Sequence, residues 1–298
     1  MQTNTKILAR EFEYLAPKTL DETLSLLDNY KDKSARILAG GTDLLVKMKT
    51  IDLKTDYLIN IKNIPELNFI DTADGLKIGA AVSLSRIERI GKVKERYPAL
   101  YEGIKSMAAI AVRNMGTIAG NIGNASPAAD TVPPLITYGA EVKLVSKRGE
   151  RTVLVEDFVT GVGKTVIEAD ELITQVNIPE MKKNSGSAFS KKGRVKADIA
   201  KINLAVYLER EGNICKDCKI VLGSVAVKAI RAKEAEGLLK GQTVSASLID
   251  KIAKKASEEI KPIDDIRSSV EYRTELARVM VEDTVKLAWK RAGGELKI

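Results

Sequence analysis

Histidine is absent from all 298 residues of this chain. Its absence excludes Ser-His-Asp and Cys-His nucleophilic catalysis, histidine proton transfer and histidine-ligated zinc. Only two cysteines are present, whereas a structural zinc ion or an iron–sulfur cluster needs about four ligands. The chain therefore either is not a catalyst or relies on a bound cofactor for its chemistry.

Aromatic residues are scarce, at 4% of the chain, which leaves few side chains that could stack on nucleic-acid bases. The formal net charge is +8, but the lysines are mixed with acidic residues, as in residues 251–259, and do not cluster. We interpret this charge as a solvated surface and expect no nucleic-acid binding.

Long apolar runs are also missing, since none approaches the roughly twenty residues that cross a bilayer. Residues 1–6 lack the basic start and apolar stretch of a signal peptide. We therefore expect no membrane span and a cytoplasmic location.

The length and the periodic patterns predict an α+β protein with two domains. Thr19 and Glu22 form a Thr-x-x-Glu capping box, which predicts a helix between short strands near residues 12–14 and 36–39. Glycine turns flanked by apolar runs predict hairpins over residues 67–80 and 141–155. A parallel doubly wound sheet is not indicated.

Residues 182–187 are small and polar, which favours a linker between the two domains. We expect one domain over residues 1–180, with lobes of about 1–62 and 63–180, and a second over 185–298. Two periodic helices end the chain. The predicted buried faces are Ile249, Ile252, Ala253, Ala256 and Ile260 in the first, and Leu276, Val279, Met280 and Leu287 in the second.

Two glycine-containing loops carry the candidate site. The first is Ala39-Gly40-Gly41-Thr42-Asp43-Leu44, with Thr42 or Asp43 as the expected cap of a helix, and the second is Gly116-Thr117-Ile118-Ala119-Gly120-Asn121. Successive N–H groups in such loops form concave anion sites. Together the loops predict one diphosphate held from two sides, although each alone could be only a tight turn. Neither Walker A nor Rossmann spacing is present.

These loops, with Ser126-Pro127-Ala128-Ala129-Asp130 after the second, resemble the FAD-binding subunit of molybdenum hydroxylases, the xanthine dehydrogenase and aerobic carbon monoxide dehydrogenase family. Further similar segments lie elsewhere in the chain, at residues 12–20, 199–201, 231–236 and 272–273. The resemblance implies a two-lobed FAD-binding domain of the vanillyl-alcohol-oxidase type (PCMH-like), followed by a smaller α+β C-terminal domain.

The resemblance also implies the residues at the FAD. Both loops would hold the diphosphate, Asp130 would contact FAD, Ile173 would lie beside the flavin, and Lys191 would be a further contact in some members of the family. The full predicted set is Ala39, Gly40, Gly41, Thr42, Asp43, Leu44, Thr117, Ile118, Ala119, Gly120, Asn121, Asp130, Ile173 and Lys191. The chain departs from the family at Ala119, where many members carry glycine, so Ala119 should have a negative φ.

By the same resemblance, electrons would arrive from a separate [2Fe–2S] subunit and leave the FAD for an acceptor such as NAD. Hydroxylation would belong to a molybdopterin-containing large subunit. Two alternatives stay open: a non-redox nucleotide-binding or assembly protein with the same diphosphate cradle, and a stand-alone FAD reductase. Cys215 and Cys218 have redox or half-metal-site spacing, and we interpret them as a surface-turn pair.

Overall fold

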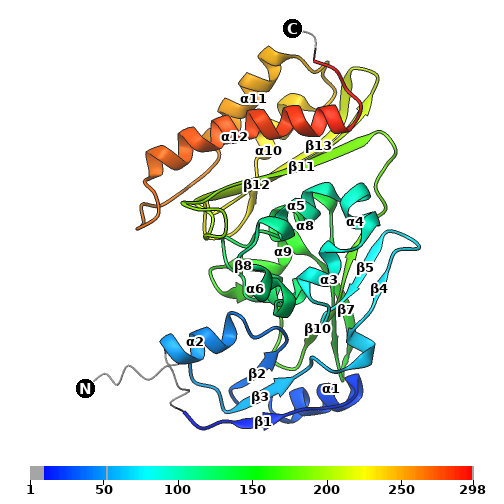
Figure 1. Cartoon of the computed structure of the whole chain (residues 1–298), viewed down its shortest axis with the longest axis vertical. Helices are drawn as coiled ribbons and strands as arrows, with labels where there is room; N and C mark the ends of the chain where they lie inside the picture. Colours follow the sequence, from blue (N-terminus) through cyan, green and yellow to red (C-terminus); the bar gives the residue numbers. More distant parts are fainter. Residues whose placement is uncertain (1–9, 52, 297–298) are drawn as a thin grey trace.

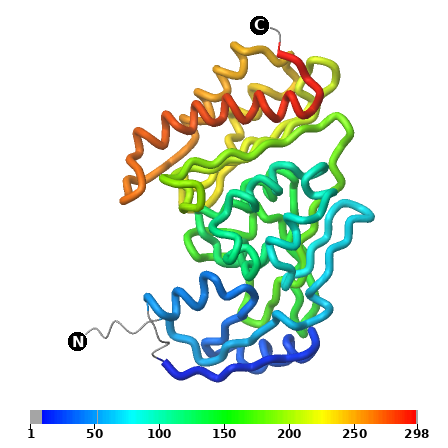
Figure 2. Tube along the Cα trace, viewed as in Figure 1, coloured from blue at the N-terminus to red at the C-terminus, as the bar shows by residue number. Residues whose placement is uncertain are grey.

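The computed structural model describes residues 10–51 and 53–296 and places three layered regions along its long axis (Figures 1 and 2). The first region lies at the bottom of Figure 1 and has three parallel strands in the order β1-β3-β2. Thr19 caps its first helix, because the Thr19 side chain accepts a hydrogen bond from Glu22 N. The elements are β1 (Glu13–Leu15), α1 (Leu20–Asn29), β2 (Ala35–Leu38), α2 (Leu44–Thr50) and β3 (Tyr57–Asn60).

The middle region contains a five-stranded antiparallel sheet in the order β4-β5-β10-β6-β7. Both predicted hairpins are present in it. Its strands are β4 (Ile70–Asp71), β5 (Leu76–Gly79), β6 (Glu141–Ser146), β7 (Gly149–Leu154) and β10 (Leu172–Ile178), with a separate pair β8 (Val159–Gly161) and β9 (Lys164–Thr165). Its helices are η1 (Pro65–Leu67), α3 (Leu84–Glu88), α4 (Gly91–Arg96), α5 (Pro98–Ser106), α6 (Ile110–Met115), α7 (Ile118–Gly123), α8 (Val132–Tyr138) and α9 (Val155–Phe158).

The last region, at the top of Figure 1, is an antiparallel sheet with helices on its outer face. Its elements are β11 (Ser185–Lys192), β12 (Ile202–Glu211), β13 (Ile214–Gly223), β14 (Ile230–Arg231), α10 (Lys233–Leu239), α11 (Ala246–Glu258) and α12 (Val270–Arg291). These elements, with the regions below them, confirm the α+β class. Among residues 10–51 and 53–296, the helices are too short or too polar to cross a bilayer.

Strand β12 is buried on both of its faces, and its side chains alternate between two hydrophobic cores. Leu204, Val206 and Leu208 pack with α11 and α12 in the outer core. Ala205 and Tyr207 join the large core of the middle region instead. This period-2 alternation means that odd-numbered residues of β12 face the middle region.

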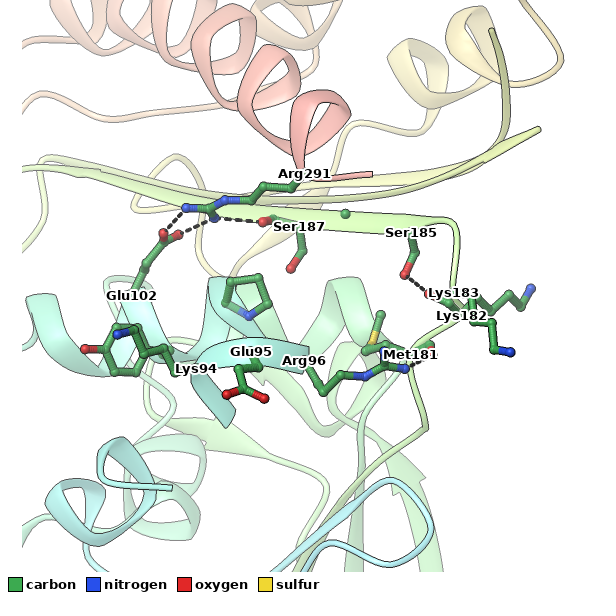
Figure 3. A pocket seen from close by; sticks show the side chains of 13 residues that line it. Lys94, Glu95, Arg96, Glu102, Met181, Lys182, Lys183, Ser185, Ser187 and Arg291 are labelled. Carbon is green, nitrogen blue, oxygen red and sulfur yellow. Dashed lines mark hydrogen bonds and ion pairs between the residues drawn. The ribbon is translucent and has the colours of Figure 1, made fainter. Parts of the chain in front are cut away.

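The two regions are joined by polar contacts as well as by packing. Arg291 at the end of α12 forms an ion pair with Glu102 of α5, and Glu102 also accepts a hydrogen bond from Phe189 N of β11 at 3.0 Å. Figure 3 shows the Arg291 and Glu102 side chains pointing toward each other above a cavity of about 380 Å³. Strand β11 is thereby fixed to α5.

Two sequence predictions of the last region are wrong, and a third is only partly right. The linker is shorter than residues 182–187, because Ser185, Gly186 and Ser187 belong to β11. A Cβ at Gly186 would lie 2.1 Å from Ala288 O, so this glycine is required by close packing on α12 and not by flexibility.

The cysteine pair does not lie in a surface turn. Cys215 and Cys218 are both buried within β13, and the turn that precedes this strand contains Gly212 with φ +59°. In α12 the predicted face is only partly right: Met280 is buried and Leu276 packs against the outer core, but Val279 and Leu287 are exposed. The buried side also includes Arg273, Thr284 and Trp289. The predicted buried face of α11 is confirmed.

Candidate functional site

The two glycine loops of the sequence meet in space, backbone against backbone. A Cβ added at Gly40 would lie 2.4 Å from Met115 O and 2.7 Å from Gly116 Cα, a separation that real side chains do not tolerate. Gly41 has φ +78°, in the left-handed region that favours glycine. Gly40 is therefore required by the contact between segments, and Gly41 by its own backbone conformation.

Each loop presents backbone N–H groups at the start of a short helix. The first loop leads into α2 through Thr42, Asp43 and Leu44, and the second leads into α7 through Ile118 and Ala119. The N–H groups in the first turn of a helix have no partner within that helix. The expected side-chain cap of α2 is absent, because Asp43 makes no capping hydrogen bond. At α7 the Thr117 side chain accepts a hydrogen bond from Gly120 N at 3.0 Å.

Ala119 lies inside α7 and is not among the described residues with positive φ, in agreement with the sequence expectation. Alanine is compatible with this position because the second loop is a helical turn and needs no left-handed residue there.

A cavity of about 900 Å³ lies between the two loops. Thirteen of the fourteen sequence-predicted residues line it, and Ile118 does not, because its side chain is fully buried in the core of the middle region. The thirteen are Ala39, Gly40, Gly41, Thr42, Asp43, Leu44, Thr117, Ala119, Gly120, Asn121, Asp130, Ile173 and Lys191. The structure thus brings together residues from all three regions.

A buried ion pair closes one part of this cavity. Lys191 Nζ lies 2.6 Å from Asp130 Oδ2, and each side chain is only 6% exposed. Lys191 also donates to Ser106 O at 3.2 Å. Burial raises the pKa of the Asp130 carboxyl, whereas Lys191 and a hydrogen bond from Asn203 oppose that rise.

Two further contacts hold the cavity wall. Thr131 Oγ1 donates to Asn121 Oδ1 at 2.6 Å, which fixes the Asn121 side chain. Lys47 of α2 donates through Nζ to Asn124 Oδ1 at 2.5 Å, linking the first region to the end of α7. The side chain of Ile173 in β10 is 6% exposed and lies on the cavity wall.

Lys47, which lines the cavity, and Asn203, which does not line it but bonds to Asp130, were both missed from the sequence. Lys47 follows Asp43 by four residues and therefore shares its side of α2, a helical spacing that could have indicated it. Asn203 is one polar residue within the apolar run of residues 202–208, a pattern that indicates a buried hydrogen-bonding partner.

The arrangement is suited to binding a large ligand with two phosphates. N–H groups at two helix starts can donate hydrogen bonds to an anion, the glycines leave room for backbone approach, and the volume lies in the range of about 300–1,000 Å³ that is typical of ligand pockets. Within the described residues no group of three or more carboxylates and cysteines could hold a metal ion.

Comparisons with known proteins agree with this geometry. Residues 10–181 match the family described as FAD binding domain in molybdopterin dehydrogenase, and residues 187–288 match the CO dehydrogenase flavoprotein C-terminal domain. The glyceraldehyde dehydrogenase medium chain of Sulfolobus acidocaldarius is 33% identical over 277 residues, which covers 93% of this chain and 98% of that protein.

Solved structures are equally similar. Carbon monoxide dehydrogenase from Hydrogenophaga pseudoflava aligns with a TM-score of 0.92 at 32% identity, covering 96% of this chain and 99% of that one. Quinoline 2-oxidoreductase from Pseudomonas putida 86 aligns with a TM-score of 0.87 at 31% identity, covering 95% and 98%.

The fold and the cavity define a flavoprotein of the oxidoreductase class. Within that class the chain belongs to the FAD-binding medium subunits of the molybdenum hydroxylases, and its cofactor is FAD. The glycines at the junction, the two helix starts that meet there and the cavity volume all fit this cofactor.

Proposed function

We propose that this chain is the electron-transfer subunit of a multi-subunit hydroxylase. Bound FAD supplies the redox chemistry, taking electrons from a [2Fe–2S] partner subunit and passing them to an acceptor such as NAD. A molybdopterin-containing large subunit carries out substrate hydroxylation. The relatives support this proposal, because several are named as medium chains or medium subunits, and one solved relative is a Cu,Mo-CO dehydrogenase.

The chain's own residues bind and orient the cofactor. The N–H groups of Thr42, Asp43 and Leu44 hold the diphosphate from one side. The second loop, in which Gly120 N and Asn121 N already bond to Thr117, holds it from the other side at the start of α7. Gly40, Gly41 and Gly120 allow this close approach, while Ala39 and Ile173 provide apolar wall. The charged pair of Asp130 and Lys191 presents a fixed carboxylate and ammonium to the cofactor.

One observation supports this function above the others. The cavity brings together backbone donors and small residues from two glycine loops and a buried ion pair, and the chain contains no histidine, the commonest side chain for proton transfer to a substrate. Residues of this kind can hold a redox cofactor and exclude water from it, which is what an electron-transfer subunit requires.

The rim of the cavity supports docking of a redox partner. Helix α6 contains no buried residue, and its side chains Ile110 and Met115 are 61% and 49% exposed. Exposed apolar side chains grouped beside a cofactor site are typical of interaction surfaces. We also propose the domain division expected from the sequence, at 1–180 (lobes 1–62 and 63–180) and 185–298; the cytoplasmic location stays a prediction.

The test compares the chain purified alone with the chain co-expressed with iron–sulfur and molybdenum subunits. The isolated chain should carry FAD rather than FMN, accept electrons from artificial donors, and hydroxylate no aldehyde, aromatic heterocycle or carbon monoxide. A colourless chain would favour the nucleotide-binding alternative. Hydroxylation of any of these substrates by the isolated chain would contradict the subunit proposal. A chain that never co-purifies with iron–sulfur and molybdenum subunits would favour the stand-alone reductase.

A further inference from the structure

Asp130 belongs to the middle region, but the groups that fix its carboxylate come from the last one. Lys191 of β11 contacts Oδ2 at 2.6 Å, and Asn203 Nδ2 of β12 donates to Oδ1 at 2.7 Å. Both carboxylate oxygens are therefore held by neighbouring strands of one sheet. The segment that carries Asp130 cannot by itself supply either contact.

Asn203 reaches Asp130 because of its position in β12. As an odd-numbered residue it faces the middle region, together with Ala205 and Tyr207. Its side chain is fully buried, and Nδ2 also lies 3.4 Å from Ala129 O. Its Oδ1 has no hydrogen-bond partner. A buried amide with an unpaired oxygen is costly, so its presence points to a function of its Nδ2 donor.

Strand β13 is shaped to accommodate this amide. Gly223 pairs with Asn203 across the β12–β13 ladder, and a Cβ there would lie 2.1 Å from Asn203 Oδ1. The next residue, Ser224, donates through its N–H to Pro127 O at 2.8 Å. Strands β11, β12 and the end of β13 therefore all hold the segment that leads to Asp130.

We propose that Asn203 is a positioning residue for FAD. It keeps the Asp130 carboxylate ionised and oriented in the cavity. The sheet of the last region thereby sets the FAD affinity of a site whose two glycine loops belong to the first and middle regions. This inference rests on the proposed function, because it requires that Asp130 faces the bound cofactor.

The electrostatics of the pair support this role. Burial raises the pKa of Asp130, and the Asn203 donor opposes that rise because it hydrogen-bonds to the ionised form. Lys191 is the charged group in direct contact with Asp130. Among the described residues, the other charged side chains that line the cavity make no hydrogen bond with Asp130; these are Lys33, Arg36, Asp43, Lys47, Glu168, Glu171 and Asp198.

The deciding variant is Asn203→Asp, which keeps the size and shape of the side chain but replaces the donor with a second carboxylate. Two carboxylates in contact cannot both ionise easily, so one of their pKa values rises strongly. We expect FAD binding at pH 8 to weaken at least about tenfold, the equivalent of one pKa unit. At pH 5.5 most of this loss should disappear, because a protonated carboxyl can again donate.

The measurement is a fluorescence titration with FAD of the full chain at pH 5.5 to 8.5, with melting curves of the apo-protein as a check on folding. Wild type should show no such pH step, and Asn203→Asp combined with Asp130→Asn should lose it because one carboxylate is gone. Equal affinity and no pH step in Asn203→Asp would overturn the inference, since a space-filling role is unaffected by this change.

If Asn203→Asp does not fold, Asn203→Leu removes the donor without adding charge and should still weaken FAD binding, with a smaller pH step. Affinity equal to wild type in that variant would also overturn the inference. Failure of the proposed function gives a different result: FAD-loaded wild type would accept no electrons from artificial donors, whatever the FAD affinity of the variants.

Discussion

At the scale of single residues, the glycines of the cavity differ in what a side chain would disturb. A side chain at Gly40 would clash with the backbone of Met115 and Gly116, and a side chain at Gly41 would be strained by the positive φ of that residue. Substitution at either position therefore disturbs the fold itself. Gly120 is exposed, and a Cβ there would meet only Thr117 Oγ1, at 3.0 Å. A substitution at Gly120 can therefore hinder the approach of a ligand without disturbing the fold.

We expect Gly120→Ala to weaken FAD binding by about tenfold or more while the melting temperature of the apo-protein changes little. The added methyl group occupies the space that a phosphate needs in order to come close to the backbone of this loop. Isothermal titration with FAD measures the effect. The matched control is Gly237→Ala in α10, where a Cβ meets no atom within 4 Å. Equal FAD affinity in both variants would mean that this loop is only a turn.

At the scale of elements, β6 and β7 are fastened to the segment before β10 by two arginines. Arg148 binds Asp170 at 2.7 Å, and Arg151 binds Glu171 at 2.6 Å. These hydrogen bonds lower the pKa of both carboxyls against the opposing effect of burial. Glu171 also lines the cavity, so this clamp fixes part of the site wall.

Because the pKa of Asp170 is lowered on folding, its contribution to stability is present above its unfolded value of 3.8 and is lost as the pH falls through the folded value. Asp170→Asn should therefore reduce the free energy of unfolding by about 1–2 kcal/mol at pH 7 and by much less near pH 3. Urea denaturation at both pH values measures this. Asp28→Asn, which removes an exposed pair with Lys31, serves as the control and should change little. An equal loss at both pH values would contradict the assignment.

Strand β13 contains a bulge that places Cys215 and Cys218 in the outer core. The register with β12 shifts between Glu209 and Arg210, so that Glu209 pairs with Asp217 and Arg210 with Cys215. Lys216 is the extra residue of this bulge. Because of it, the side chain of Cys218 enters the same core as that of Cys215. The neighbouring Cys215 and then burial raise the pKa of the Cys218 thiol, which makes this thiol a poor nucleophile and metal ligand.

Replacing both cysteines with alanine should leave FAD content and electron acceptance unchanged and should lower stability by about 1–3 kcal/mol through lost packing. Alanine is preferable to serine here because a buried hydroxyl would need a partner. Flavin absorbance, iron content and urea denaturation test the prediction. A loss of iron or of electron transfer would reveal a metal or redox role shared with another chain.

Several elements could be predicted from the sequence because local chemistry determines them. The Thr19 cap, the hairpins and the apolar face of α11 are examples. The buried face of α12 could be predicted only in part, since it includes Arg273, which binds Asp265 at 2.7 Å inside the fold, and Thr284. The bulge in β13 also has no local signature, because its polar residues Lys216 and Asp217 imitate a turn.

Most residues predicted for the candidate site lie together at one cavity, and their contacts with FAD stay predictions. The glycine loops are short contiguous motifs, and the family resemblance implied Asp130, Ile173 and Lys191. Asn203 depends on tertiary packing between two regions, and no spacing in the sequence indicates which carboxylate it contacts.

At the scale of the whole molecule, the cavity joins regions that are far apart in the chain, and the single tryptophan reports on one of them. Trp289 is fully buried in the outer core, with Nε1 donating to Glu295 O at 3.2 Å. Its fluorescence therefore follows the unfolding of the last region, whereas flavin absorbance follows the cavity.

Excess FAD should raise the urea midpoint of the Trp289 fluorescence transition, because Lys191 and Asn203 make the last region part of the binding site. At a free concentration of one hundred times Kd, the free energy of unfolding should increase by about 2.7 kcal/mol. FMN at the same concentration serves as the control and should have a smaller effect. A midpoint unaffected by FAD would show that the two regions unfold independently.

The contacts of Asp130 also have a consequence for how the protein is made. Synthesis runs from the N-terminus, and domains fold as they leave the ribosome. A nascent chain that ends near residue 181 has both glycine loops but neither Lys191 nor Asn203. We therefore expect tight loading of FAD to follow the emergence of β12 and β13, so that the flavin is taken up late in translation by a nearly finished chain. Stalled nascent chains of increasing length would show flavin retention rising only beyond Gly223.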